Sequence, residues 1–207
     1  MKLTLALACL LTSPIVLATQ ANPLDPNDAL PLAPPVHSVE WRGVLAEIKS
    51  PVADLETRAS REAALLHGPA EVAAEGLVDR IAGNANYQLH PLQPFIATLG
   101  TPAVLSTFVT TQRDKAVKSA GTLVNKPEPL RVGYSISVTP SLQPGTPDGV
   151  VMSEVVVAQT LADGNSVHNA NAYNKAGLRE GDFQTLVWTT GDRQFLLVLR
   201  RKASPGF

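Results

Sequence analysis

The chain has 207 residues, and its 17 Lys and Arg against 18 Asp and Glu give a net charge of −1. This balance disfavours proteins that bind nucleic acid through a basic surplus. A hydrophobic fraction of 44% with 17% charged residues excludes a disordered chain and a multi-span helical membrane protein. The one cysteine is Cys9, so we expect no disulfide and no cysteine-ligated metal.

Residues 1–21 have the pattern of a removable export signal. Lys2 supplies a positive charge, an apolar run extends over 3–18, and the small residues Ala18 and Ala21 suit a signal peptidase. The run is shorter than the roughly 20 apolar residues of a membrane-spanning helix. Lipid attachment at Cys9 is the alternative, but cleavage there leaves too short an apolar segment, so an ordinary secretory signal is the better interpretation.

The remainder of the chain divides into a linker, one domain and a short tail. Residues 22–35 contain five prolines, which favour an extended tether without a hydrogen-bond ladder. We expect a single β-rich domain over 36–203 and a tail over 204–207. A domain of this length can bury a core of its own.

The front of the domain is predicted to hold a strand and two short helices. Residues 36–48 favour a strand, and 55–67 are rich in helix formers. Residues 70–82 carry an apolar stripe that suits a second helix, with a stop at Gly83.

Strands and turns dominate from residue 87 onward. The clearest alternation covers 131–139, where Val132, Tyr134, Ile136 and Val138 share one face. Other strands are expected over 95–99, 103–111, 150–159, 183–190 and 194–200, with a hairpin connection over 143–149. The Asn-rich stretch 162–176 is typical of a long exposed loop. The expected fold class is α+β, a mostly antiparallel β-sheet with one or two short N-terminal helices.

No arrangement of residues predicts catalysis, a cofactor or a metal. The four histidines, His37, His67, His90 and His168, lack metal-site spacing. A weak metal site at His168 with Asp163 is less favoured than a solvated loop histidine.

Two further charged groups have ordinary explanations. Glu180 and Asp182 resemble a carboxylate pair, but turn carboxylates usually face solvent. The basic stretch of Arg113, Lys115, Lys118 and Lys126 is interrupted by acidic residues, which indicates a solvated loop face. We therefore predict that the protein is not an enzyme.

One ordered set of motifs carries a family resemblance. The strand 132–140 with the sequence Val-Gly-Tyr-Ser-Ile-Ser-Val-Thr-Pro is followed by Asp148-Gly149 and an apolar return strand. Before it comes Gly100-Thr101-Pro102-Ala103 between two strands, and after it an apolar strand that ends in basic residues. This order resembles the C-terminal β-module of bacterial secretins, the outer-membrane channels of type II and III secretion and type IV pili.

The resemblance implies an exported, oligomeric component of the periplasm or outer membrane of a Gram-negative bacterium. Its partners would be other copies or other secretion and pilus components, with no nucleic acid and no small-molecule substrate. The residues that it singles out for strand pairing and assembly are Val132, Gly133, Tyr134, Ile136, Val138 and Pro140. The chain departs from the family because it has no room for the repeated periplasmic modules and has one tight hairpin where secretins place a gate.

Two other functions remain open from the residues alone. The chain suits a monomeric periplasmic binding or adaptor domain with 162–176 as its contact surface, where Asn165, Asn169, Asn171 and Asn174 offer amides that both donate and accept hydrogen bonds. A periplasmic hydrolase is the third hypothesis, although it lacks a nucleophile paired with a base.

Overall fold

The structure is a computed structural model that describes residues 38–66, 72–119, 121–145, 147, 149–164 and 166–202. These residues belong to one compact unit, Val36–Phe207. The predicted export signal, the Pro-rich linker, the tail over 204–207, Cys9, His37 and His67 lie outside the described residues. None of the helices in the described ranges combines the length and the apolar character needed to cross a membrane.

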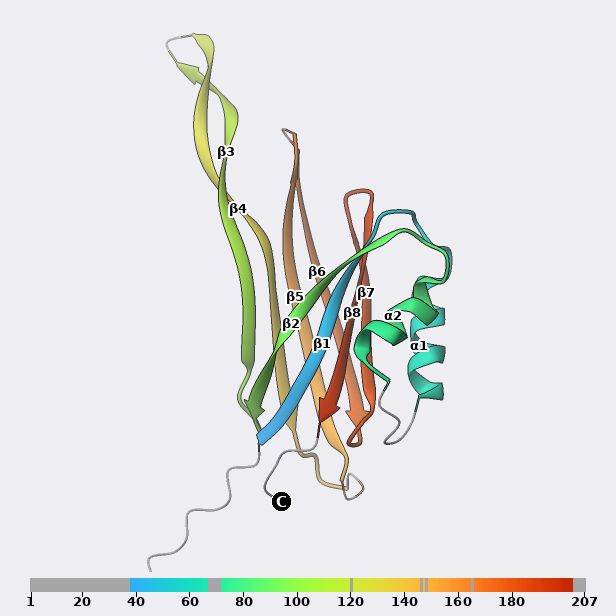
Figure 1. The fold of residues 1–207 in the computed structure, drawn as a ribbon. Helices are drawn as coiled ribbons and strands as arrows, with labels where there is room; N and C mark the ends of the chain where they lie inside the picture. Colours follow the sequence, from blue (N-terminus) through green and yellow to red (C-terminus); the bar gives the residue numbers. More distant parts are fainter. Residues whose placement is uncertain are drawn as a thin grey trace, which may run out of the picture. The chain divides into compact units, whose positions relative to one another are not determined.

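Two four-stranded antiparallel sheets form the fold (Figure 1). Sheet A has the strand order β2-β1-β8-β7, formed by Tyr87–Thr98, Ser38–Ile48, Arg193–Lys202 and Phe183–Thr190. Sheet B has the order β3-β4-β5-β6, formed by Ala103–Ser119, Thr122–Ser141, Val151–Asp163 and Ser166–Leu178. The predicted fold class is confirmed.

The main core lies between the two sheets. Trp41 of β1 and Leu197 of β8 face sheet B and pack with Ile136 of β4 and Val155 of β5, all at most 1% exposed. The neighbouring residues of β1 and β8 point to the opposite side of sheet A. Both strands are therefore buried on two faces, which explains why β8 is a continuous apolar run rather than an alternating one.

Two helices cover the outer face of sheet A (Figure 1). They are α1, Leu55–Leu65, and α2, Ala74–Ala82. The predicted apolar stripe of α2 is buried, with Leu77, Val78 and Ile81 fully enclosed against β1 and β8. The helix ends as predicted at Gly83, whose positive φ of 61° suits a residue without a side chain.

The alternation predicted for β4 is confirmed, because Ile136 and Val138 are fully buried in the core. The strand is longer than its alternating part, and it pairs with β3 from Ala103↔Val138 to Ser119↔Thr122. The basic stretch of Arg113, Lys115, Lys118 and Lys126, predicted as a loop face, therefore lies in the paired strands β3 and β4. Its polar, proline-containing sequence lacks the apolar alternation by which strands are recognised.

The prediction of a long loop over 162–176 is wrong. Residues 166–178 form β6, which pairs with β5 without a break from Val151↔Leu178 to Asp163↔Ser166. Alternate side chains of β6 lie at least partly buried, and Ala170, Ala172 and Ala176 are among them. Small residues occupy the core side of the strand, so its sequence lacks the alternation of large apolar residues that predicts a strand.

The core predicts a clear difference between two leucine-to-alanine variants. Leu197→Ala removes a side chain that is 1% exposed, whereas Leu142→Ala removes one that is 58% exposed. We expect Leu197→Ala to lower the free energy of unfolding by about 2–5 kcal/mol, and Leu142→Ala to change it by less than about 0.5 kcal/mol. Urea unfolding monitored by tryptophan fluorescence measures both. Equal destabilisation of the two variants would contradict the described core.

Candidate functional site

The residues predicted for assembly all lie in β4, inside sheet B. Ile136, Val138 and Pro140 are buried, and Val132, Gly133 and Tyr134 are half-buried. The backbone from Gly133 to Val138 pairs with β3 on one side and β5 on the other. These residues hold the sheet together within one chain, and their part in assembly stays a prediction. The strands with an unused hydrogen-bonding edge are others.

Sheet B has two open edges in the part of the chain that the structure describes. β3 pairs only with β4, and β6 pairs only with β5. Each edge presents a row of backbone N–H and C=O groups that pair with no other strand in the described chain. Neither strand contains a proline over its 17 and 13 residues, respectively.

Sheet A is different at its edge strand β2. This strand contains Pro91 and Pro94, and a proline at a sheet edge removes a donor and obstructs an incoming strand. The other edge strand, β7, is covered by α1, and it also lies close to β6. This contact involves the Asn174 side chain and no pairing of the two strands, so the backbone edges of β3 and β6 remain available for pairing with another chain.

Two prolines reveal which backbone groups of β3 point outward. Pro127 and Pro129 lie in β4 opposite Asp114 and Gln112, inside an unbroken register. Because proline has no N–H, these pairs must be the ones that do not exchange ladder hydrogen bonds. The same alternation places the N–H groups of Ser106 and Phe108 on the open edge of β3.

The asparagines predicted as a contact surface are divided between two faces of β6. Asn169 and Asn171 lie on the outer face, and the Asn169 amide oxygen accepts a hydrogen bond from Thr160 Oγ1 at 2.9 Å. Asn174 lies on the inner face, where its Nδ2 donates to Thr185 O at 3.2 Å and its Oδ1 accepts from Gln184 Nε2 at 3.0 Å. Asn174 therefore ties β6 to β7, and Asn165 lies outside the described residues.

The histidines and turn carboxylates considered as candidate site residues make ordinary structural contacts. Within the described ranges, no group of three or more His, Cys, Asp or Glu could hold a metal ion. His168 lies in β6 against Gly191, and His90 in β2 lies 4.0 Å from Glu47 Oε2. Asp182 Oδ2 accepts a hydrogen bond from the Arg179 N–H at 2.7 Å across the β6–β7 turn.

Glu180 and Asp182 also act on a neighbouring cation. Burial lowers the pKa of the Arg201 guanidinium, and the two carboxylates oppose this effect. Arg201 Nη1 donates to Leu178 O at 2.6 Å and to Gly149 O at 2.7 Å. The carboxylates thus offset the charge of an arginine that joins the end of β8 to the end of β6 and to the turn before β5.

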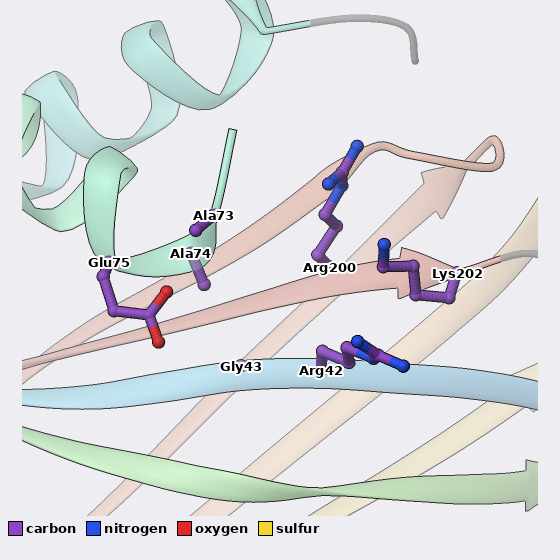
Figure 2. Close-up of a pocket in the computed structure, with 7 residues that line it drawn as sticks. All are labelled: Arg42, Gly43, Ala73, Ala74, Glu75, Arg200 and Lys202. Atoms are coloured by element: carbon purple, nitrogen blue, oxygen red, sulfur yellow. The ribbon is translucent and has the colours of Figure 1, made fainter. Parts of the chain in front are cut away.

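A pocket of about 340 Å³ lies where α2 begins (Figure 2). Three cations, Arg42, Arg200 and Lys202, line it together with Glu75. Arg42 Nε donates to Glu40 Oε1 at 2.9 Å. Arg200 lies over the Phe183 ring and donates to the Val72 and Gly181 carbonyl oxygens, each at 3.3 Å. These contacts fasten the start of α2 to sheet A, which is a structural role.

The part of the β3–β4 hairpin that has no third strand beside it is here called the ribbon, residues 109–119 and 122–132. The pairing of β4 with β5 stops at Gly133↔Thr160, whereas β3 and β4 continue to Ser119↔Thr122. Figure 1 shows this hairpin projecting beyond the other strands. The ribbon contains five basic residues against two acidic ones: Arg113, Lys115, Lys118, Lys126 and Arg131 against Asp114 and Glu128.

Glu128 is the electrostatic centre of the ribbon. Its carboxylate accepts hydrogen bonds from Arg113 Nη2 at 3.0 Å and Lys115 Nζ at 3.2 Å. These bonds, first that of Arg113 and then that of Lys115, lower the pKa of Glu128. Lys115 and Lys126 are directly opposed in the register, an arrangement that is unfavourable without a nearby anion.

Comparisons with known proteins give weak similarities only. No family model matches the chain, and no curated protein matches it. Among solved structures, the Salmonella SPI-1 type III secretion injectisome secretin InvG gives a TM-score of 0.38 at 10% identity, covering 81% of this chain and 63% of that one. The V. cholerae type IV competence pilus secretin PilQ gives 0.31 at 14% identity, covering 81% and 57%.

The InvG secretin domain β-barrel from the Salmonella SPI-1 injectisome gives a similar result, with a TM-score of 0.36 and 10% identity. The chain thus spans less than two thirds of the length of each of these structures, between 57% and 63%. Scores of this size do not establish a common fold. A functional conclusion has to come from the chain's own edges and charges.

The ribbon gives a prediction for acid pH. Because the pKa of Glu128 is lowered in the folded chain, its stabilisation is complete above the unfolded pKa and disappears as the pH falls through the folded value. We expect Glu128→Gln to lower the hydrogen-exchange protection factors of the Arg113 and Lys126 amides near neutral pH. We expect acid to lower them in the wild type as well, after correction for the pH dependence of the intrinsic exchange rate. Asp114→Asn is the control. It removes from the same ribbon a carboxylate that makes none of the Glu128 hydrogen bonds. Equal effects of the two variants would rule out the central role of Glu128.

Proposed function

We propose that the chain is an exported, non-enzymatic structural protein: a secretin-like module of an outer-membrane protein secretion or type IV pilus machine. Copies assemble through backbone pairing between β3 of one subunit and β6 of the next. The sequence from Val132 to Pro140 and its Asp148-Gly149 turn supports the choice of machine. The observation that carries the assembly is the pair of open, proline-free edges of sheet B.

The strand directions suit this pairing. Sheet B is an antiparallel meander of four strands, so β3 and β6 run in opposite directions. When a rotation about an axis roughly parallel to the strands relates the copies, every strand keeps its direction. β6 of one copy and β3 of the next then meet antiparallel, as do all other pairs in the sheet. An even number of strands makes the sheet continuous from subunit to subunit.

The two edges belong to different strands, so the contact is head to tail. A head-to-tail contact produces a ring when the rotation closes and a filament when it does not. A twofold dimer through β3 alone leaves every β6 edge uncovered. Head-to-tail pairing in a closed ring covers both edges of every copy, which is why we favour it.

The β4 residues support this assembly from inside the subunit. Ile136 and Val138 fix sheet B to sheet A through the common core. The outer face of sheet B carries a row across all four strands, Val104, Ser137, Val156 and Tyr173, in consecutive register. Its two outer members are more than half exposed, Val104 at 59% and Tyr173 at 57%. Ring formation brings Tyr173 of one copy toward Val104 of the next and buries part of both.

The alternative is a monomeric periplasmic adaptor that uses the same edge. The open edge of β6 can accept an extended peptide from another protein by strand addition. In that case the outer-face amides of Asn169 and Asn171 lie beside the incoming peptide. A monomer in detergent that captures a peptide would favour this function over the ring.

Proline substitutions at the two edges can block pairing between chains without unfolding the subunit. Ser106→Pro removes an N–H that points away from β4, so the subunit ladder stays intact while the outer edge is obstructed. The register carried across β5 makes Asn171→Pro the equivalent change on β6. We expect the wild type to form detergent-stable oligomers, and each proline variant to shift them to monomers.

Light scattering after size-exclusion chromatography gives the masses. Ser106→Ala and Asn171→Ala are the matched controls and should assemble as the wild type does. Thermal unfolding of every variant establishes that the fold is retained. A monomeric wild type, or unchanged oligomers in both proline variants, would refute pairing through these edges.

A further inference from the structure

We propose that the end of the ribbon docks on the surface of a membrane that contains anionic phospholipids. The contact is made end-on by Lys118, Lys126, Leu123 and Val124, and the ribbon does not cross the membrane. The inference deepens the proposed function and rests on it, because it assigns a role to the part of sheet B that projects from the assembled ring.

The ribbon needs a partner because little in its own subunit supports it. Its eleven register pairs, from Val109↔Val132 to Ser119↔Thr122, have no third strand beside them. An isolated two-stranded ribbon is at best marginally stable in water. Pairing of β6 with β3 does not remove this deficit. When Tyr173 lies beside Val104, Ser166 at the start of β6 lies beside Thr111, so residues 112–119 of β3 stay without a second partner.

Basic and aliphatic side chains meet at the end of the ribbon. Lys118 is directly opposite Leu123, and Val117 is directly opposite Val124. Leu123 is 73% exposed, the largest exposed fraction among the large hydrophobic residues of the described chain, and Val124 is 43% exposed. Exposed aliphatic residues next to lysines are typical of segments that insert shallowly between anionic headgroups.

The charges occur on both faces of the ribbon. Lys115 and Lys126 share one face, and Lys118 shares the other with Arg131, by the alternation of the register. A protein groove usually meets one face of such a hairpin. A layer of headgroups surrounds the end of the ribbon and meets both faces, which favours a lipid surface over an acidic protein.

The middle of the ribbon limits how deep it can enter. Arg113, Asp114, Lys115 and Glu128 lie between its base and the contact residues at its end, and they occupy both faces. Basic side chains facing lipid at the bilayer centre cost about 2–4 kcal/mol each. Only the last few residues of each strand therefore enter the headgroup region.

Vesicle binding of the protein matured from the full chain tests the charge contribution. The probes are vesicles of phosphatidylcholine alone and of equal parts phosphatidylcholine and phosphatidylglycerol. We expect binding to the anionic vesicles, weakened by molar salt, and weakened about 30-fold in Lys118→Gln/Lys126→Gln. Lys49→Gln/Arg61→Gln is the control, since it removes the same charge from the turn after β1 and from α1.

Tryptophan reporters test the end-on geometry. The native Trp41 and Trp188 are buried and provide a constant background. With anionic vesicles, we expect Leu123→Trp to be quenched by brominated lipid and Gln112→Trp, in the middle of the ribbon, to stay accessible to aqueous acrylamide. Quenching of both by brominated lipid means that the ribbon crosses the bilayer and overturns the proposal.

Other outcomes also decide the question. Equal binding to neutral and anionic vesicles, or equal loss in the two double variants, overturns the role of the lysines. Oligomers of unchanged mass that bind no vesicles would refute the docking while the ring proposal stands. Monomers that bind anionic vesicles through Leu123 would refute the ring and leave the docking intact.

Discussion

Unpaired backbone groups along β3 and β6 are the constraint on which the behaviour of this protein depends. β1, β5 and β8 are paired on both sides, and so is β4 from Gly133 onward, whereas β2 contains prolines and β7 lies beside α1 and β6. Peptide N–H and C=O groups require partners wherever water is excluded from them. In the proposed function, these two proline-free edges find their partners in other copies of the chain.

The rest of the fold keeps these two edges apart and correctly directed. Sheet A is buried on both faces, by the helices on one side and by sheet B on the other. The shared core fixes sheet B to this layer as an open four-stranded meander, with β3 and β6 at opposite edges. Position 133 has to be a glycine, since a side chain there would overlap the Thr107 carbonyl where β3 and β4 approach closely. The ribbon begins next to this close approach.

The apolar parts of the fold were predictable, and the polar strands were not. The stripe of α2, the alternation of Val132 to Val138 and the run of β8 all signalled burial, and each lies in the core. The sequence of β6 predicts a loop because small alanines and the polar Asn174 occupy its inner positions and asparagines its outer ones. The ribbon was read as a solvated loop because charges and prolines replace apolar residues there, and its register comes from the continuation of the β3–β4 ladder. The sequence therefore pointed to the central strand β4, whereas the open edges follow from strand order, which no local pattern encodes.

Disulfide trapping between subunits tests the pairing of β3 with β6 most directly. Cysteines at Ser106 and Asn171 place one thiol on each edge, and the only native cysteine, Cys9, lies in the predicted export signal. Mixed Ser106→Cys and Asn171→Cys chains should give cross-linked heterodimers on mild oxidation, and the double variant should give a ladder of higher multiples. Cross-links only between identical positions, or none in either mixture, would contradict head-to-tail assembly through sheet B.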